Sequence, residues 1–441
     1  MDSGARAGDN VAVNRTRLWL VPLLLAVMVG GAWYFGYRSK AEDRELPVYV
    51  TAGERMAAGG EIYQAAADKK PFTYPPFAAL PFVPFAALPA NWQPAAWFLV
   101  NFAMLVGLVT WFGRWAARDL PGRAPPRWLP FWFLVAVVGG RHVASVLTNQ
   151  SHDLFIAGAV ALAAAAWCRG RSTAGVWVGI GAAVKATPLL FVGLFVLRGR
   201  WLALGLLVAA AALATLWPDW WFPRSDGRWW GQVWFDVNLR GLEVGGAARG
   251  AGAWNPYSIL NQSLSGTLLR LFTTSPGGSK FVVGEPGQAL WLELSPATFK
   301  VVNYLAQAAV LGVIGWGILR ARRAIAAAAD PIAMQAWLGL GEVAAIACGM
   351  VLLSPQSSKS HFCVWLFPVA FVVDRLLRGP RDRLALALFA AGAVVGLLAK
   401  DLLGTQRGNL LLGFGNVTWA TVLLLLATVR CLHGRQRDVA P

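Results

Sequence analysis

The sequence predicts an all-α integral membrane protein that crosses the bilayer about ten times. Hydrophobic residues make up 57% of its 441 residues and charged residues only 14%, whereas a soluble domain has roughly a quarter charged residues. The mean hydropathy is +0.51. Apolar runs of about 20 residues, long enough to span a hydrocarbon layer, recur from Leu18 to Val429.

These runs are spread along the whole chain, so we expect residues 1–441 to form a single membrane domain. No small-residue cleavage pattern follows the first run, and we therefore expect a retained helix there and not a signal peptide. The expected spans are residues 17–36, 92–113, 128–146, 153–168, 201–217, 297–319, 331–352, 361–374, 384–399 and 409–429.

A further apolar run, residues 173–197, is predicted to form a broken hairpin. Basic residues stand at both of its ends, and the segment Lys185–Pro188 interrupts its middle, where proline cannot continue a regular helix. The hairpin brings the expected number of membrane helices to about 10–12. Its first arm is long enough to carry Lys185 past the membrane midplane, where irregular backbone has to be buried in protein or line a cavity.

Arginine-rich short loops set the predicted orientation. When the expected spans cross the membrane in alternating directions, more than half of the 39 Lys and Arg residues fall on the same side of it. The positive-inside rule assigns this side to the cytoplasm. We therefore expect a plasma membrane protein with both termini in the cytoplasm. The net charge of +17 then reflects membrane orientation, and no nucleic-acid partner is expected.

Two long outer loops follow from this orientation. Residues 37–91 contain the proline-rich stretch Phe72–Pro89, which we expect to be an interfacial helix. Residues 218–296 are rich in Trp, Gly and Asn and are long enough to form a small subdomain outside the membrane.

Two carboxylates come soon after the first span. Asp43 and Glu45 lie on the predicted outer surface, where either could act as a general base that takes a proton from an acceptor hydroxyl. A solvated acidic loop without a catalytic role would have the same spacing.

Lys185 needs a partner, because an ammonium group is costly at the depth of the predicted hairpin. A phosphate group is one candidate, since lysine binds phosphate as a point charge. The alternative is a structural ion pair with a carboxylate such as Glu342.

Further polar residues stand at the outer ends of the predicted spans. Arg141 ends one span, residues 149–153 open the next, and Lys359 and His361 begin a third. His361 could donate to a leaving phosphate, or it could only cap its helix. The four cysteines lie in or beside apolar runs, so we expect neither a disulfide nor a cysteine-based metal site, and no cofactor. Because no nucleotide-binding motif is present, an activated substrate would be a lipid that reaches the site from the bilayer.

Several short motifs, taken in order, resemble glycosyltransferase family 87. The similarity covers most of the chain, and the shared order of the motifs is more specific than any one of them. The motifs are Glu45-Leu46-Pro47-Val48-Tyr49, Gly60-Glu61-Ile62-Tyr63, Phe72–Phe77, the Gln150 turn, Gly179–Pro188, Asn261–Leu264 with Arg270, Leu294–Thr298 and Leu353–Pro355.

The resemblance implies a GT-C-like bundle and an inverting transfer reaction. A hexosyl group, with mannose as one candidate, would pass from a polyprenyl-phosphate sugar to a hydroxyl of an envelope glycolipid or glycan on the outer face. Glu45 or Asp43 would be the base. The implied ligands of the donor phosphate are Lys185, His361, Lys359 and Arg141, and the implied substrate-binding residues are Tyr49, Tyr74, Gln150, His152, Asn261, Gln262 and Arg270.

Two departures from the family pattern bear on these roles. The family usually has aspartate where this chain has Glu45, and paired histidines where this chain has only His361. The main alternative to an enzyme is a secondary transporter or lipid flippase, because a broken hairpin with a buried charge also marks transport sites. No inverted repeat is visible in the sequence, which favours the transferase.

Overall fold

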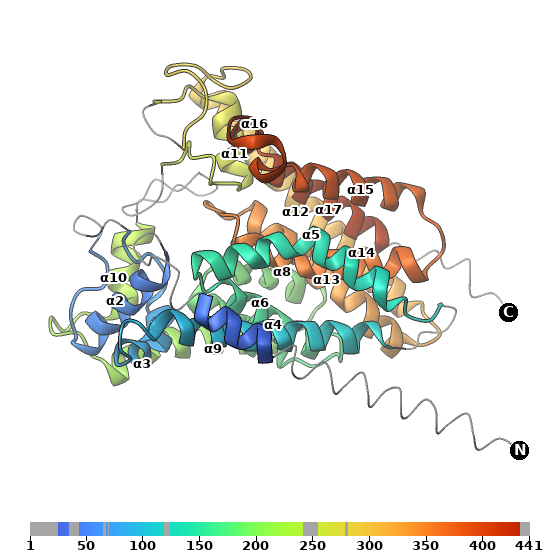
Figure 1. Cartoon of the computed structure of the whole chain (residues 1–441). Coiled ribbons are helices and arrows are strands. Elements are labelled where there is room, and N and C mark those ends of the chain that lie inside the picture. The colour runs from blue at the N-terminus through green and yellow to red at the C-terminus, as the bar shows by residue number, and fades with distance from the viewer. Residues whose placement is uncertain are drawn as a thin grey trace, which may run out of the picture.

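The computed structural model of the chain describes residues 25–34, 44–64, 68, 70–118, 124–240, 255–277 and 281–432. Within these ranges the chain is helical and contains no strand, which confirms the all-α class. The long helices lie side by side in a bundle, and α2 (Leu46–Ala57), α3 (Val83–Ala86) and α10 (Trp230–Trp234) gather at one end of it (Figure 1). We call this end the α2 end.

The helix lengths confirm a polytopic membrane protein. In the described part of the chain, five helices are long and apolar enough to cross a membrane. They are α4 (Gln93–Ala116), α5 (Trp128–Asn149), α9 (Trp201–Trp221), α12 (Pro296–Ala326) and α13 (Pro331–Leu352). Shorter apolar helices accompany them, including α6 (Asp153–Trp167), α7 (Ala174–Val184), α8 (Phe191–Leu197) and α17 (Asn416–Cys431).

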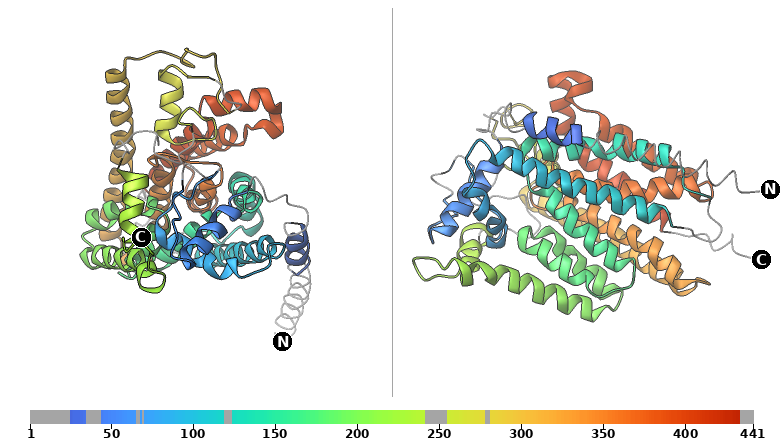
Figure 2. Two further views of the ribbon diagram at one scale, coloured as in Figure 1. Left: turned by 90° about the vertical axis from the view of Figure 1, so that its left-hand side faces the viewer. Right: turned by 60° about the horizontal axis from the view of Figure 1, so that its bottom comes forward.

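Helix α13 forms the centre of the bundle. Within the window that fits a membrane span, 94% of α13 is buried, because this helix is apolar around most of its circumference. Gly341 lets α14 (Leu366–Arg378) approach closely, since a Cβ at this position would lie 2.5 Å from the ring of Phe371. The other long helices run alongside this centre (Figure 2).

Residues 173–197 contain α7, the short 3-10 helix η4 (Thr187–Leu190) and α8. Helix α7 packs tightly on α9 because Gly175 has no side chain, and a Cβ there would lie 1.9 Å from a carbonyl oxygen of α9. The helix stops where Lys185 adopts an extended conformation, with φ −153° and ψ 125°. The break places Lys185 at the α2 end of the bundle.

The proline-rich stretch Phe72–Pro89, expected as one interfacial helix, forms two short ones. These are the 3-10 helix η3 (Pro76–Phe82) and the single turn α3. Phe82 is buried, and its backbone lies so close to α2 that a Cβ on Gly53 would approach it to 2.6 Å. The prolines prevent a continuous helix, and the stretch becomes one wall of a compact cluster with α2.

The predicted span 409–429 begins too early. The structure instead has α15 (Arg383–Leu397), then α16 (Lys400–Gly413), and then α17. Helices α15 and α16 meet at 85°. Helix α16 has a charged first turn and contains Gly404 in a left-handed conformation, with φ 78°. It therefore turns out of the bundle and lies beside α11 (Leu264–Phe272) (Figure 1).

Candidate active site

Glu45 stands at the start of α2. Pro47 lies in the first turn of this helix, where a missing N–H costs no helical hydrogen bond. The backbone N–H of Glu45 donates to the carbonyl oxygen of Asn149 at 2.9 Å, and the hydroxyl of Tyr49 lies 3.5 Å from Glu45 Oε2. The start of α2 is thus fastened to the end of α5, which fixes the backbone of Glu45.

The environment of Glu45 suits a general base. Burial raises the pKa of its carboxyl above the ordinary value, while the positive charges of Lys70 and Lys185 oppose that shift. A carboxylate with a raised pKa is a stronger base, and groups of this kind cluster in active sites. The other candidate base, Asp43, lies outside the described residues.

Lys185 forms an ion pair with Asp153, with Nζ 2.9 Å from Oδ1. The two side chains are only 12% and 6% exposed. The hydroxyl of Ser151 donates to the second carboxylate oxygen of Asp153 at 2.9 Å. Because Asp153 opens α6 and Lys185 follows the last residue of α7, the pair joins the ends of two adjacent helices.

The sequence pattern did not single out Asp153, and the alternative partner expected for Lys185, Glu342, is wrong. Glu342 pairs with Arg198 at 2.7 Å, next to the end of α8. The available signal for Asp153 was its position as an acidic residue that opens an apolar helix directly after the polar residues 149–152.

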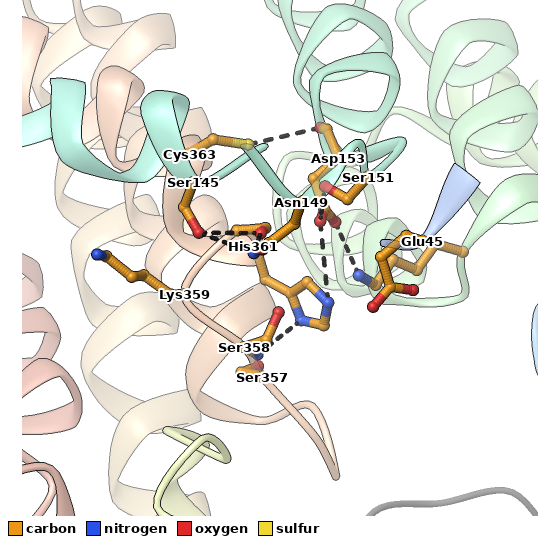
Figure 3. Close-up of polar contacts among 12 residues, drawn as sticks. Glu45, Ser145, Asn149, Ser151, Asp153, Ser357, Ser358, Lys359, His361 and Cys363 are labelled. Carbon is orange, nitrogen blue, oxygen red and sulfur yellow. Dashed lines mark hydrogen bonds and ion pairs between the residues drawn. The ribbon is translucent and has the colours of Figure 1, made fainter. Parts of the chain in front are cut away.

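His361 faces the ion pair from the 3-10 helix η6 (His361–Trp365), which precedes α14. The backbone N–H of Ser358 donates to its Nδ1 at 3.1 Å, so in the neutral ring the proton is on Nε2. Nε2 lies 3.9 Å from Asp153 Oδ2, too far for a hydrogen bond. Figure 3 shows Glu45, Asp153 and His361 gathered together, while Lys359 points away from them.

His152 lies between two tyrosine rings of residues 37–91, the segment expected to form the first outer loop. Its ring makes edge contacts with Tyr49 and Tyr74, with centroids 4.9 and 4.3 Å apart. The ring is buried, and neither of its nitrogens has a hydrogen-bond partner among the described residues. Buried polar atoms are normally satisfied, so His152 is a candidate contact for a bound substrate. Lys185 Nζ lies 5.8 Å from the Tyr74 centroid, which places these rings beside the ion pair.

The turn at Gln150 has an uncommon backbone conformation. Gln150 has φ 57°, and in the described part of the chain it is the only residue other than glycine with a positive φ. Such conformations persist where the surrounding structure fixes them, and here Trp97 Nε1 donates to the Gln150 carbonyl oxygen at 3.0 Å. The turn thereby sets the positions of Ser151, His152 and Asp153.

Arg141 and Lys359 do not join this cluster. The guanidinium of Arg141 donates to the carbonyl oxygen of Gly396 on α15. The carbonyl oxygen of Lys359 lies 2.9 Å from His142 Nδ1. Arg141 thus contacts α15, and the charged groups near the Lys359 side chain are Arg141 and the residues Lys400 and Asp401 of α16.

Three of the expected substrate-binding residues belong to residues 218–296, the segment expected to form the second outer loop, and make mainly structural contacts. They are Asn261, Gln262 and Arg270. Arg270 is buried and donates to carbonyl oxygens at the end of α16, as does Gln262. The side-chain oxygen of Asn261 accepts from the backbone N–H of Ser357 at 3.0 Å. These bonds hold Asn261, Gln262 and Arg270 against α16 and the loop before η6. Their connection to the residues around Lys185 is the bond between Asn261 and Ser357.

A small cavity of about 10 Å³, the size of about one water molecule, lies at the ion pair, and its lining suits a phosphate oxygen. Its lining includes Asp153, Lys185, Thr187, Ser357 and His361. An ammonium group, an imidazole N–H and hydroxyl groups are suitable donors to a phosphate oxygen. With Glu45 beside them, these residues are candidates for a base and for an anion site, which are the parts needed to transfer a group from a phosphate to a hydroxyl.

The model of glycosyltransferase family 87 matches residues 72–355. The match covers well over half of the chain, and the chain therefore belongs to this family. The protein is a membrane glycosyltransferase that depends on a polyprenol-phosphate sugar. This confirms the family suggested by the sequence motifs.

Curated relatives cover nearly the whole chain. A polyprenol-phosphate-mannose-dependent alpha-(1-2)-phosphatidylinositol mannoside mannosyltransferase of Mycobacterium tuberculosis is 27% identical over 463 residues, which cover 96% of this chain and 92% of the relative. The corresponding phosphatidylinositol pentamannoside mannosyltransferase of Mycolicibacterium smegmatis is 26% identical over 440 residues, covering 94% of this chain and 90% of the relative. No solved structure matches the chain.

Proposed function

We propose that the protein transfers a mannosyl group from a polyprenyl-phosphate donor to a hydroxyl of a phosphatidylinositol-type envelope glycolipid, with inversion at the anomeric carbon. The names of the two long relatives support this sugar and this class of acceptor. The observation that carries the proposal is the convergence of Glu45, Lys185 and His361 at one end of the bundle, from segments far apart in the sequence.

Glu45 acts as the general base in this proposal. It accepts the proton of the acceptor hydroxyl while the hydroxyl oxygen forms a bond to the anomeric carbon. The bond from that carbon to the phosphate oxygen breaks, and its electron pair leaves with the polyprenyl phosphate. Attack and departure take place on opposite faces of the sugar, so a single displacement inverts the configuration.

Lys185 and His361 stabilise the charge on the departing phosphate. The ammonium group of Lys185 has three N–H donors, and Asp153 accepts only one of them. The Nε2–H of His361 supplies a further donor. Asp153 and the Ser358 N–H hold these groups in place before the reaction, and preorganised donors of this kind lower a barrier by several kcal/mol.

We place the α2 end at the outer face of the plasma membrane, with both termini in the cytoplasm. Arginines support this orientation, because Arg118 and Arg322 donate to carbonyl oxygens near the start of α13 and at the end of α8, at the opposite end of the bundle, as the positive-inside rule expects of the cytoplasmic side. Donor and acceptor lipids would then both reach the site from the outer leaflet.

The position of the cluster favours a transferase over a secondary transporter or lipid flippase. A transport site lies near the bilayer midplane between repeated halves of the protein. Here the backbone N–H of Glu45 bonds to Asn149 at the end of the span-length helix α5, so the cluster lies beside the end of a full span.

A transfer assay with purified protein tests the proposal. The protein is incubated with radiolabelled polyprenyl-phosphate sugars and with phosphatidylinositol mannosides or other extracted envelope glycolipids. We expect label to pass from the mannosyl donor to the glycolipid, with an anomeric configuration opposite to that of the donor by NMR. Retained configuration, or movement of donor across vesicles without transfer, would contradict the proposal.

A further inference from the structure

We propose that a groove between α4, α6 and α7 binds an anionic phospholipid of the membrane leaflet opposite the Glu45 site. The groove has an apolar part along the helices and a basic part at the far end of the bundle. This polarity matches a lipid with acyl chains and a charged headgroup. The inference does not depend on the sugar or acceptor proposed above.

The apolar part is a cavity of about 320 Å³ on the surface of the bundle. Its lining includes Met104, Trp111, Leu162 and Ile180, and its walls are almost entirely hydrocarbon. It is kept open partly by Gly107, because a Cβ added there would meet nothing within 4 Å. An acyl chain can therefore lie along this face without displacing protein atoms.

The basic part is a cavity of about 270 Å³ whose lining includes Arg114, Arg118 and Arg169. Gly107 and Trp111 line both cavities, so the two parts are continuous. Of the residues that the structure describes, no carboxylate lines the basic part. Among the described residues, no ion pair joins any of these three arginines to an acidic side chain.

Each guanidinium has N–H groups to spare for a ligand. Arg118 donates to the carbonyl oxygen of Ala336 at 3.0 Å, and Arg169 donates to that of Ala165 at 3.0 Å. Arg114 is exposed. Since a guanidinium carries five N–H donors, three of them together can bind a phosphate through several hydrogen bonds.

The basic part lies at the end of the bundle opposite Glu45. Trp97, near the start of α4, bonds to the Gln150 turn at the α2 end, whereas Arg118, just beyond the other end of α4, bonds to Ala336 near the start of α13. Basic pockets between membrane helices on the cytoplasmic side bind anionic lipid headgroups. The donor phosphate proposed for Lys185 would bind at the other end of α4, so the two lipid sites are distinct.

Lipid retention by the full-length protein tests the inference. The protein is purified in a mild detergent, its bound lipid is identified by native mass spectrometry, and its melting temperature is measured with added phosphatidylglycerol or with phosphatidylcholine of the same acyl chains. The variants are Arg114→Gln/Arg169→Gln, which leaves the bond from Arg118 to Ala336 intact, and Gly107→Leu, which fills the groove.

Two matched controls separate the groove from general effects. Arg323→Gln removes an exposed arginine from the last turn of α12. Gly205→Leu changes a helical glycine of α9 whose added Cβ would also meet nothing within 4 Å. Both controls should retain the lipid as the wild-type protein does.

We expect the wild-type protein to retain one phosphatidylglycerol or similar anionic phospholipid and to be stabilised by phosphatidylglycerol but not by phosphatidylcholine. The double arginine variant and Gly107→Leu should bind it about tenfold or more weakly. Four results would each overturn the inference. The protein could bind phosphatidylcholine as well as phosphatidylglycerol, or be stabilised equally by soluble glycerol phosphate. It could retain a polyprenyl phosphate in place of a phospholipid, or both groove variants could retain the phospholipid as the wild-type protein does.

Discussion

Lys185 and Asp153 join the ends of α6 and α7 through an ion pair with Nζ 2.9 Å from Oδ1. The same two residues line the cavity that we assign to the donor phosphate. The pair therefore has two separable effects: it stabilises the helix ends, and it presents an ammonium group to a ligand. Substitutions at the two positions can distinguish these effects.

Lys185→Met should lower both stability and donor binding, because it leaves the buried Asp153 carboxylate without its cation. Breaking a buried pair on one side costs roughly 3–5 kcal/mol, which a melting curve detects. The double variant Lys185→Met/Asp153→Asn should recover most of the melting temperature but should still bind polyprenyl-phosphate mannose about tenfold or more weakly than wild type.

Arg198→Met provides a control for this experiment, since it breaks the buried pair with Glu342 away from the cavity. It should lower the melting temperature without changing donor affinity. If the double variant binds donor as well as the wild-type protein, Lys185 has a structural role only.

Substitution of His361 tests which ring nitrogen is used. The Ser358 N–H occupies Nδ1, which leaves Nε2–H as the donor to phosphate. A glutamine amide can reach the position of Nε2, whereas an asparagine amide is too short. We expect His361→Gln to retain about tenfold more transfer activity than His361→Asn. Equal activities would show that the Nε2 donor has no part in transfer.

The pH dependence of transfer reports on Glu45. Burial raises the pKa of its carboxyl above the ordinary value of 4.5 for glutamate. Because a base works only when it is deprotonated, kcat/KM should fall as the pH falls through this raised pKa. Lys70 lowers this pKa. Lys70→Gln should therefore move the acidic limb to higher pH, while the exposed Lys300→Gln should leave it in place. A limb unaffected by Lys70→Gln would argue against Glu45.

Reporter fusions test the orientation of the chain. The distribution of arginines leads us to expect cytoplasmic signals from fusions after Arg118, Arg322 and Arg435, and an external signal from a fusion near Gly250. A cytoplasmic signal at Gly250 would invert the orientation and place the proposed site on the wrong face.

Several features of the fold follow directly from the sequence. Apolar runs and flanking arginines predicted the positions of most helices to within a few residues, because the bilayer imposes length and composition on each helix separately; five of the described helices are long and apolar enough to cross a membrane. The span predicted at 331–352 coincides with α13. Lys185–Pro188 likewise marked the break after α7, since proline acts on its own helix.

Features that depend on distant parts of the chain could not be predicted in this way. Lys185 and Asp153 are 32 residues apart, and only the packing of α6 on α7 selects Asp153 over other carboxylates such as Glu342. Arg270 resembled a substrate ligand in its motif, but its partners come from the end of α16, a helix that the apolar pattern did not separate from α17.

The measurement that tests the central claim most directly is single-turnover transfer from labelled polyprenyl-phosphate mannose by Glu45→Gln, compared with Glu54→Gln. Glu54 is an exposed residue of the same helix and serves as the matched control. We predict that Glu45→Gln transfers the sugar about 10²–10⁴-fold more slowly, with donor affinity and melting temperature unchanged, and that Glu54→Gln has the wild-type rate. Full activity in Glu45→Gln would contradict the account, and loss of transfer in Asp43→Asn instead would assign the base to Asp43.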